Sequence, residues 1–272
     1  MSSPEPPAIT LAHLSDLHFG TEDWTMAARL LDEVAELRPR LTVVSGDLTQ
    51  RARRRQFAAA RAYLDRLGPL LVVPGNHDIP LYDVTRRALS PMGRYRSMVT
   101  DEPNPFVVDD ELAVLGLNTT RPARWKEGSI SPAQVELIRS SFAGAPATAR
   151  RVLVTHHPFL PPPSLPRAIV VHGRDAALAA IREAGVELLL AGHLHLGYAD
   201  VVGGGDGPLS VQAGTAFSRR RRGQPNAYNV ITLDAAGVQV QPRVWDGDGF
   251  RPAAGPGAQE ADAGPGSAGS IG

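Results

Sequence analysis

The sequence predicts an α/β fold with two stacked sheets and helices on the outside. Short apolar runs alternate with stretches of helical spacing through the first two thirds of the chain. The last third has strand-like runs without helices between them. Polar residues of the kind that bind metals follow several of the apolar runs directly, so function is expected where the strands end.

The predicted buried strands are rich in Val, Leu and Ile and are bounded by Gly, Pro, Asn or Asp. They cover Ile9 to Ser15, Leu41 to Ser45, Leu70 to Val73, Leu112 to Leu117, Arg151 to Thr155 and Val186 to Ala191. The β-rich end adds Leu209 to Gln212, Ala227 to Leu233 and Val238 to Val244. Strands that alternate with helices predict βαβ units in the middle of the chain, and together with the β-rich end they fit two stacked sheets with helices outside.

The predicted helices lie between these strands. Apolar residues recur at helical spacing from Met26 to Leu37 and from Phe57 to Leu67. A capping box begins the next helix at Ser131, with Pro132 at its first position. The last helix covers Asp175 to Ala184, and Gly185 follows as its C-terminal stop.

One domain is predicted for residues 9–246, because the polar motifs spread from residue 16 to residue 195 and have to meet. Residues 1–8 are predicted to be a flexible N-terminus. Residues 247–272 are largely Gly, Ala, Pro and Ser, with few large apolar side chains to offset the entropy of ordering. We therefore expect a disordered tail there.

The amino-acid composition limits the classes of partner that the protein is expected to bind. Lys+Arg and Asp+Glu number 28 each, so no global field attracts nucleic acid or anionic lipid, and nucleic acid is an unlikely partner. The absence of cysteine excludes disulfides and thiolate metal sites. No apolar run approaches the ~18 residues that span a bilayer, and Met1 to Pro7 does not resemble a signal peptide. These features predict a cytoplasmic protein without a membrane span, and they leave its oligomeric state open.

Five short motifs carry the chemistry. They are Asp16-Leu17-His18, Gly46-Asp47, Gly75-Asn76-His77-Asp78, His156-His157-Pro158 and Gly192-His193-Leu194-His195. Each follows a predicted strand, so we expect them to meet at one edge of a sheet. Together they offer the oxygen and imidazole ligands of a site for two metal ions, an arrangement that suits hydrolysis of a phosphate ester.

The spacing within the motifs suggests individual roles. Asp16 and His18 come off the first strand, where residues i and i+2 point to the same side, so they can hold one ion together. The carboxylate of Asp47 has two oxygens and can bridge two cations. Asn76 offers a neutral carbonyl ligand, and His77 beside it points the other way and is free for acid chemistry.

Other basic residues leave two interpretations open. His13 lies inside the first strand, where a core or supporting hydrogen bond is favoured. His157 and His172 flank the site and a Pro-rich loop, so each is either a substrate contact or plain structure. Arg51 begins one arginine cluster and Arg219 to Arg222 form another. Both clusters could attract an anionic substrate, and a solvated helix face and loop explain them equally well.

With these motifs in order, the chain resembles the calcineurin-like metallophosphoesterase superfamily over roughly residues 9–233. The resemblance implies a four-layer αββα sandwich of two mixed sheets and two divalent metal ions, Mn, Fe, Zn or Co. It implies that a metal-bound hydroxide attacks phosphorus and that His77 is the catalytic acid. One ion would be held by Asp16, His18, Asp47 and His195, and the other by Asp47, Asn76, His156 and His193.

The motif details favour one branch of that superfamily. Protein phosphatases are disfavoured, because Gly46 to Arg51 lacks their second aspartate. DNA-directed nucleases of the fold usually carry a capping domain, for which little sequence remains. The chain looks most like bacterial class III cyclic-nucleotide and glycerophosphodiester phosphodiesterases, which implies a small phosphodiester substrate. A nuclease, a nucleotide-sugar or lipid pyrophosphatase and a non-catalytic interaction scaffold remain as alternatives.

Overall fold

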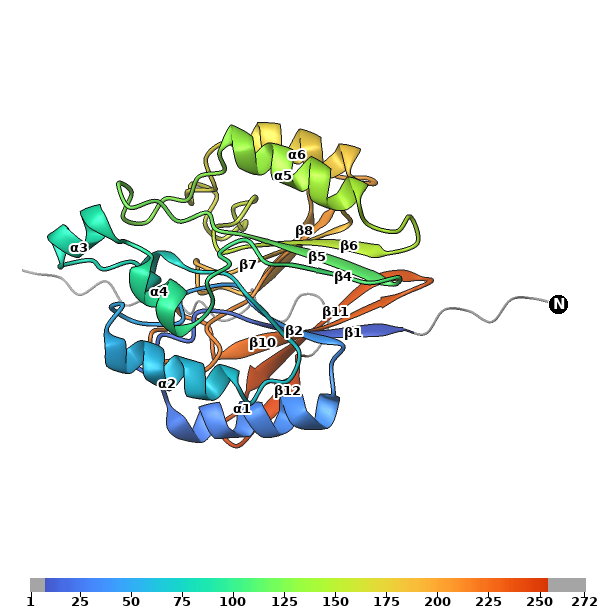
Figure 1. The fold of residues 1–272 in the computed structure, drawn as a ribbon. Helices are drawn as coiled ribbons and strands as arrows, with labels where there is room; N and C mark the ends of the chain where they lie inside the picture. Colours follow the sequence, from blue (N-terminus) through green and yellow to red (C-terminus); the bar gives the residue numbers. More distant parts are fainter. Residues whose placement is uncertain (1–7, 254–272) are drawn as a thin grey trace, which may run out of the picture.

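Two mixed sheets pack face to face in the computed structural model, which describes residues 8–253. Within these residues each sheet has six strands. Helices α1 (Trp24–Leu37) and α2 (Arg54–Leu64) cover the outer face of one sheet, and α5 (Pro132–Ala143) and α6 (Arg174–Glu183) cover that of the other (Figure 1). The two sheets and two helical layers confirm the predicted αββα sandwich.

The first sheet has the order β12-β11-β10-β1-β2-β3. Its strands β1, β2 and β3 run parallel, β10 pairs antiparallel with β1, and β11 and β12 each pair antiparallel with the strand before them. In chain order the strands are β1 (Ile9–Leu14), β2 (Leu41–Val44), β3 (Leu70–Val72), β10 (Ala227–Asp234), β11 (Gly237–Trp245) and β12 (Phe250–Pro252). The carboxyl ends of the three parallel strands therefore share one edge of this sheet.

The second sheet has the order β4-β5-β6-β7-β9-β8. Its four central strands are parallel, and the two edge strands are antiparallel to their neighbours. The strands are β4 (Phe106–Val108), β5 (Leu112–Leu117), β6 (Arg150–Thr155), β7 (Leu188–Ala191), β8 (Tyr198–Val201) and β9 (Leu209–Gln212). The turns after β6 and β7 lie at the same end of the molecule as those after β1 to β3, the left side in Figure 1.

The inner faces of the sheets form an aliphatic core. Leu11 and Val43 of the first sheet belong to the same buried cluster as Val154 and Leu190 of the second. Because the outer faces are covered by helices, the central strands are apolar on both sides, which explains the continuous Val/Leu/Ile runs in the sequence. The core thus holds both sets of strand ends in fixed register.

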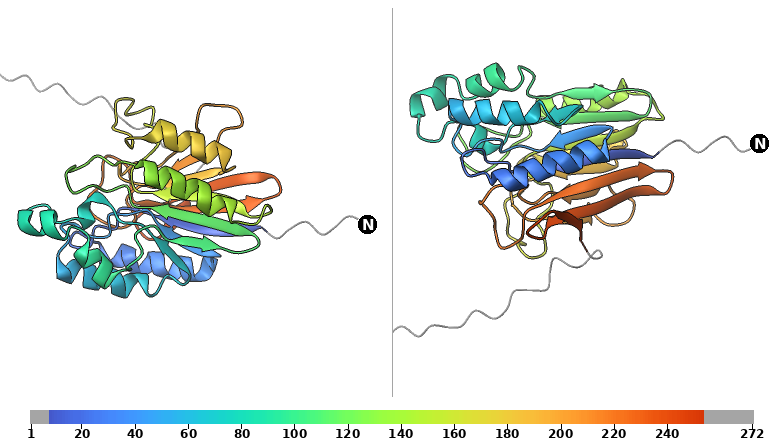
Figure 2. Two further views of the ribbon diagram at one scale, coloured as in Figure 1. Left: turned by 45° about the horizontal axis from the view of Figure 1, so that its top comes forward. Right: turned by 90° about the horizontal axis from the view of Figure 1, so that it is seen from below.

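The short elements were not expected from the sequence. They are β4, β8, β12, the helices α3 (Val84–Leu89) and α4 (Gly93–Met98) and the 3-10 turn Asn76–Asp78. Figure 2 shows α3 and α4 projecting at the end of the molecule where the motifs lie. Helix α2 ends at Leu64, where a helix reaching Leu67 was expected. The unexpected strands, helices and 3-10 turn each have at most six residues, too few for a periodic pattern to stand out.

The predicted domain end at residue 246 is too early. Strand β12 pairs with β11, and the Phe250 ring is buried against Tyr228 and Trp245. Residues 1–7 and 254–272, the remainder of the predicted flexible ends, lie outside the described residues. No helix between residues 8 and 253 has the length and apolar content required to cross a membrane.

Candidate metal centre

The five motifs meet in turns that follow β1, β2, β3, β6 and β7. One group of ligand-type side chains contains Asp16, His18, Asp47 and His195, and a second contains His156, His157 and His193. Within each group the potential ligand atoms all lie within 4.8 Å of one another. The motifs therefore meet as expected, but they come from the edges of both sheets and not from one, because β6 and β7 belong to the second sheet.

The first group is enclosed by protein. The Nε2 atom of His195 lies 3.3 Å from Asp16 Oδ1, and that of His18 lies 3.6 Å from Asp16 Oδ1 and 3.6 Å from Asp47 Oδ2. The Nδ1 of His195 donates to the carbonyl oxygen of Arg220 at 2.6 Å. This bond fixes the tautomer of a neutral imidazole, so His195 turns its Nε2 lone pair toward Asp16.

The histidines of the second group come from turns that follow β6 and β7 of the second sheet. The Nε2 of His156 lies 3.3 Å from Asp47 Oδ1 and 3.2 Å from Asn76 Oδ1, and the Nδ1 of His193 lies 3.1 Å from the same Asn76 oxygen. The other ring nitrogen of His156 donates to the carbonyl of Ser45 at 2.8 Å. Asp47 therefore presents one oxygen to each group.

Backbone strain is concentrated in these turns. Seven non-glycine residues between 8 and 253 have a positive φ, and five of them are Asp16, His18, Asp47, His193 and His195. The expected reason for the Asp16 and His18 pairing is wrong, because β1 ends at Leu14 and both residues are in a left-handed turn. Their common direction comes from that strained turn. Strand alternation has no part in it.

Two motif glycines are required by close approach. A Cβ on Gly75 would lie 2.1 Å from Asp47 Oδ1, and one on Gly192 would lie 1.8 Å from Ser15 Oγ and 2.6 Å from Asp16 Oδ2. Only glycine lets these turns pass so close to the carboxylates. The glycines before Asn76 and His193 thus set the distance between the turns.

A family model described as calcineurin-like phosphoesterase matches residues 9–197, which is most of the folded chain. The chain belongs to the calcineurin-like phosphoesterases. It is therefore a metal-dependent phosphoric ester hydrolase. The family assignment made from the five motifs is confirmed.

Individual relatives of this phosphoesterase agree with the family. A probable cyclic nucleotide phosphodiesterase from Rhodococcus erythropolis (strain PR4 / NBRC 100887) is 29% identical over 237 residues, which span 78% of this chain and 73% of that protein. The glycerophosphodiester phosphodiesterase GpdQ from Enterobacter lignolyticus (strain SCF1) is 38% identical over 80 residues, 25% of this chain and 29% of that protein. A dimetal phosphatase from Danio rerio superposes with a TM-score of 0.59 over 86% of this chain and 99% of that one. At 14% identity, the last similarity shows the fold alone.

The chemistry of the donor atoms fits a metal ion in this phosphoesterase. Asp16 Oδ1 is buried without a hydrogen-bond partner among the described residues. It faces the lone pair of His195 Nε2, and two acceptors 3.3 Å apart have no proton to share. A cation between them removes the repulsion, and mixed carboxylate and imidazole ligands suit Mn, Fe, Co or Zn.

The charge states of the carboxylates also fit a metal ion at this site. Burial alone would raise the pKa of Asp47, but His156 and His77 beside it hold that pKa well below its usual range. Burial would also raise the pKa of Asp16, which His195 and His18 lower. Burial lowers the pKa of His193 to about 3. The site therefore presents ionised carboxylates beside a neutral imidazole, which is the state in which these side chains bind metals.

His77 lies beside both groups and belongs to neither. Its backbone N–H donates to Asp47 Oδ1 at 2.8 Å, and its Nδ1 donates to the carbonyl of Gln50 at 2.9 Å. Nε2 is thereby left as the ring atom available to a ligand. Burial lowers the pKa of His77 to about 4, partly opposed by Asp47, so the free protein holds this ring neutral at pH 7.

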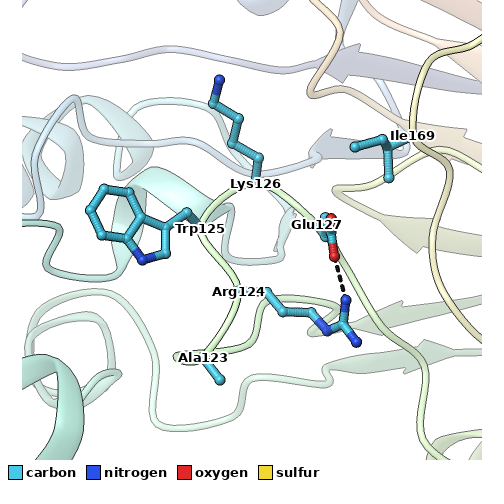
Figure 3. Close-up of a pocket in the computed structure, with 6 residues that line it drawn as sticks. All are labelled: Ala123, Arg124, Trp125, Lys126, Glu127 and Ile169. Atoms are coloured by element: carbon cyan, nitrogen blue, oxygen red, sulfur yellow. Dashed lines mark hydrogen bonds and ion pairs between the residues drawn. The ribbon is translucent and has the colours of Figure 1, made fainter.

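A cavity of about 460 Å³ opens over the ligand groups and reaches members of both. Asp47, Asn76, His77, His193 and His195 line its base. Its walls come from Lys126, from residues 164–169 and from Arg220 and Arg222. A neighbouring cavity of about 570 Å³ is lined by residues 123–127 and Ile169, and the two cavities share Lys126 and Ile169 (Figure 3). A substrate that extends beyond its phosphate has space on this side.

The predicted substrate contacts lie in different places. His157 is buried, and its Nδ1 lies 2.7 Å from Thr119 Oγ1. His172 is exposed and pairs with Glu127 at 3.1 Å. None of the lining residues of the cavity over Asp47 is His157, His172 or Arg51. Arg51 lies next to the site, with its Nη1 3.4 Å from His77 Nδ1. His13 bonds Ser45 Oγ at 2.9 Å in the core, as expected.

Sequence reasoning did not single out two residues that the structure places at the site. The buried carboxylate of Asp78 accepts from the backbone N–H groups of Leu48, Thr49 and Gly75, which ties the Asp47 turn to the Asn76 turn. Arg220 lies with its Nη1 3.3 Å from His77 Nδ1, and its carbonyl holds His195. Asp78 closes the GNHD motif and could have been noticed there. Arg220 is indistinguishable by sequence from its arginine neighbours.

Proposed function

We propose that this phosphoesterase hydrolyses a small phosphodiester, with two divalent metal ions at the site. One ion would be held by Asp16, His18, Asp47 and His195, and the other by Asp47, Asn76, His156 and His193. The observation that carries the proposal is the position of Asp47, whose two oxygens face imidazoles of different groups at 3.6 and 3.3 Å. A carboxylate placed in this way suits a shared ligand.

The metals would supply an activated water and offset the charge of the phosphoryl oxygens. The residues of the chain do the remaining work. Asp47 also fixes His77 through its backbone N–H, and Gln50 fixes the ring, so Nε2 is held beside the base of the cavity. In this proposal a bound phosphate anion favours the protonated ring, and Nε2–H passes its proton to the leaving oxygen.

Arg220 would assist at the same position. Its guanidinium lies against His77 and lines the cavity, so it can donate to a phosphoryl oxygen. Guanidinium groups suit this task because their N–H donors are fixed in a plane and remain charged. Support for a diester over a monoester comes from the two curated relatives, whose names describe phosphodiesterases.

The test is turnover of diesters by metal-loaded protein. Wild type loaded with Mn should hydrolyse bis(4-nitrophenyl) phosphate, a 3′,5′-cyclic nucleotide or a glycerophosphodiester faster than 4-nitrophenyl phosphate. The matched variants are Asp47→Ala, which should lose the activity, and Asp206→Ala at an exposed position, which should keep it. Preference for the monoester, or full activity in Asp47→Ala, would refute the proposal. Release of nucleotides from linear DNA in place of small diesters would indicate a nuclease.

A further inference from the structure

The walls of the 460 Å³ cavity over the candidate metal ligands are strongly basic. Lys126, Arg167, Arg220 and Arg222 line it, and we refer to these four residues as the basic rim. They come from three separate segments: the loop after β5, the Pro-rich loop after β6 and the loop after β9. Asp47 at the base is the one acidic residue among the lining residues of the described chain.

The positive charge of the basic rim is not neutralised by the protein. None of its four side chains forms an ion pair with a carboxylate between residues 8 and 253. Arg220 is partly buried and held against Gln50 and His77, each 3.3 Å from its Nη1. Lys126, Arg167 and Arg222 are exposed. Arg220 is therefore placed to contact the scissile phosphate of the proposed function, and the other three are more exposed.

A single phosphodiester has too little charge for this arrangement. Its one negative charge would already be offset by two divalent ions and Arg220. Three further cations that face the same cavity repel one another, and a cavity lined by one sign of charge concentrates the opposite sign. The neighbouring cavity, which shares Lys126 and Ile169 with this one, provides room for a second group.

We propose that the substrate is a phosphodiester that carries a second phosphate group, which Lys126, Arg167 and Arg222 bind. This inference rests on the proposed function, because the scissile phosphate is assumed to bind at the candidate metal ligands. The class includes dinucleotides with a terminal phosphate and phosphorylated glycerophosphodiesters. Arg220 remains with the scissile phosphate.

Matched substrate pairs test the second phosphate. One pair is the dinucleotide ApA and its 5′-phosphorylated form pApA, and the other is glycerophosphoinositol and its 4-phosphate. For metal-loaded wild type we expect kcat/KM to be about 10-fold higher for the phosphorylated member of each pair, because partly exposed ion pairs contribute modestly each. Equal kcat/KM within both pairs would overturn the proposal.

Variants locate the effect. In Arg167→Gln/Arg222→Gln the preference should fall to about 2-fold, because the more strongly charged substrate loses its partners. Arg96→Gln, an exposed arginine of α4 outside the cavity lining, should keep the wild-type preference. A preference unchanged in the double variant would overturn the assignment to the basic rim.

A binding measurement separates this inference from the proposed function. Calorimetric Kd values of the metal-loaded protein for adenosine 3′,5′-bisphosphate and for AMP should differ by about 10-fold, and the difference should shrink with added salt. If no diester is hydrolysed but the bisphosphate still binds more tightly and the double variant loses this difference, the proposed function fails and the basic rim stands. Equal Kd values for the two nucleotides would overturn the proposal that the basic rim binds a second phosphate, whether or not diesters are hydrolysed.

Discussion

The turns at the base of the site bury their polar side chains, whereas the loops around the cavity expose theirs. Asp16, His18 and Asp47 are at most 1% exposed, and their turns are strained, tied to one another and spaced by glycine. Lys126, Arg167 and Arg222 project from exposed loops. The difference separates two tasks. The base requires atoms fixed within fractions of an ångström, and the rim requires charge at approximately the right place.

Substitutions at the base of the site should therefore have large effects on function, and substitutions in the basic rim should have small ones. Substitutions in the base are expected to alter metal content, turnover or stability by large factors. Substitutions in the rim are expected to alter the preference among substrates and little else. The following variants test this division, from the largest expected effect to the smallest.

Asp47→Ala should have the largest effect, because one carboxylate faces both groups of ligands. Its removal forfeits several kcal/mol of transition-state charge stabilisation, a loss of at least ~10³-fold in kcat. Metal analysis should find both ions lost or weakly held. Asn76→Ala should weaken mainly one ion, since Asn76 Oδ1 lies within hydrogen-bond distance of His156 and His193, which are assigned to the same ion. Two tightly bound ions per chain in Asp47→Ala would rule out the shared ligand.

His77→Ala should reduce turnover by ~10²–10⁴-fold for a diester with an alkoxide leaving group, the usual range for general acid catalysis. Its metal content should stay at the wild-type level. The loss should be smaller for bis(4-nitrophenyl) phosphate, because nitrophenolate hardly needs a proton. Equal losses for both diesters would show that His77 stabilises charge on the phosphoryl oxygens. Loss of metal would identify it as a ligand.

The ligands could be found from the sequence because each belongs to a short motif behind an apolar run. Continuous burial on both faces makes the central strands visible, and the strand ends then bring the motifs together. The directions of the side chains and the roles of the surrounding residues could not be predicted, because they depend on contacts between turns that are distant in the sequence. The direction of Asp16 and His18 comes from left-handed backbone, and Arg220 differs from Arg221 only through the turn that carries it. Phe250 follows a Gly-rich stretch, so nothing local marked it as part of the core.

Asp78→Asn tests the base without touching a candidate ligand. The amide keeps one acceptor and places a donor against the backbone N–H groups that the carboxylate now satisfies. We expect a loss of about 2–4 kcal/mol in the free energy of unfolding, because at least one buried donor is left unsatisfied. Urea unfolding measures it, and Asp206→Asn at an exposed position is the control. Wild-type stability and metal content in Asp78→Asn would mean that the two turns hold each other without Asp78.

Trp125→Ala should have the smallest effect on stability and turnover, because Trp125 lies next to the basic rim and outside the base of the site. The indole is 62% exposed at the edge of the neighbouring 570 Å³ cavity, so its removal should change the free energy of unfolding by less than about 0.5 kcal/mol. The backbone carbonyl of Trp125 accepts from Asn76 Nδ2 at 3.3 Å, and this bond survives truncation of the side chain. Metal content and kcat should therefore be unchanged, and KM should rise a few-fold only for diesters whose leaving group reaches this neighbouring cavity. Trp24→Ala, 57% exposed at the start of α1, is the matched control for the loss of a surface indole. A fall in metal content in Trp125→Ala would show that this loop supports Asn76 through its side chain, and the loop would then belong to the base of the site.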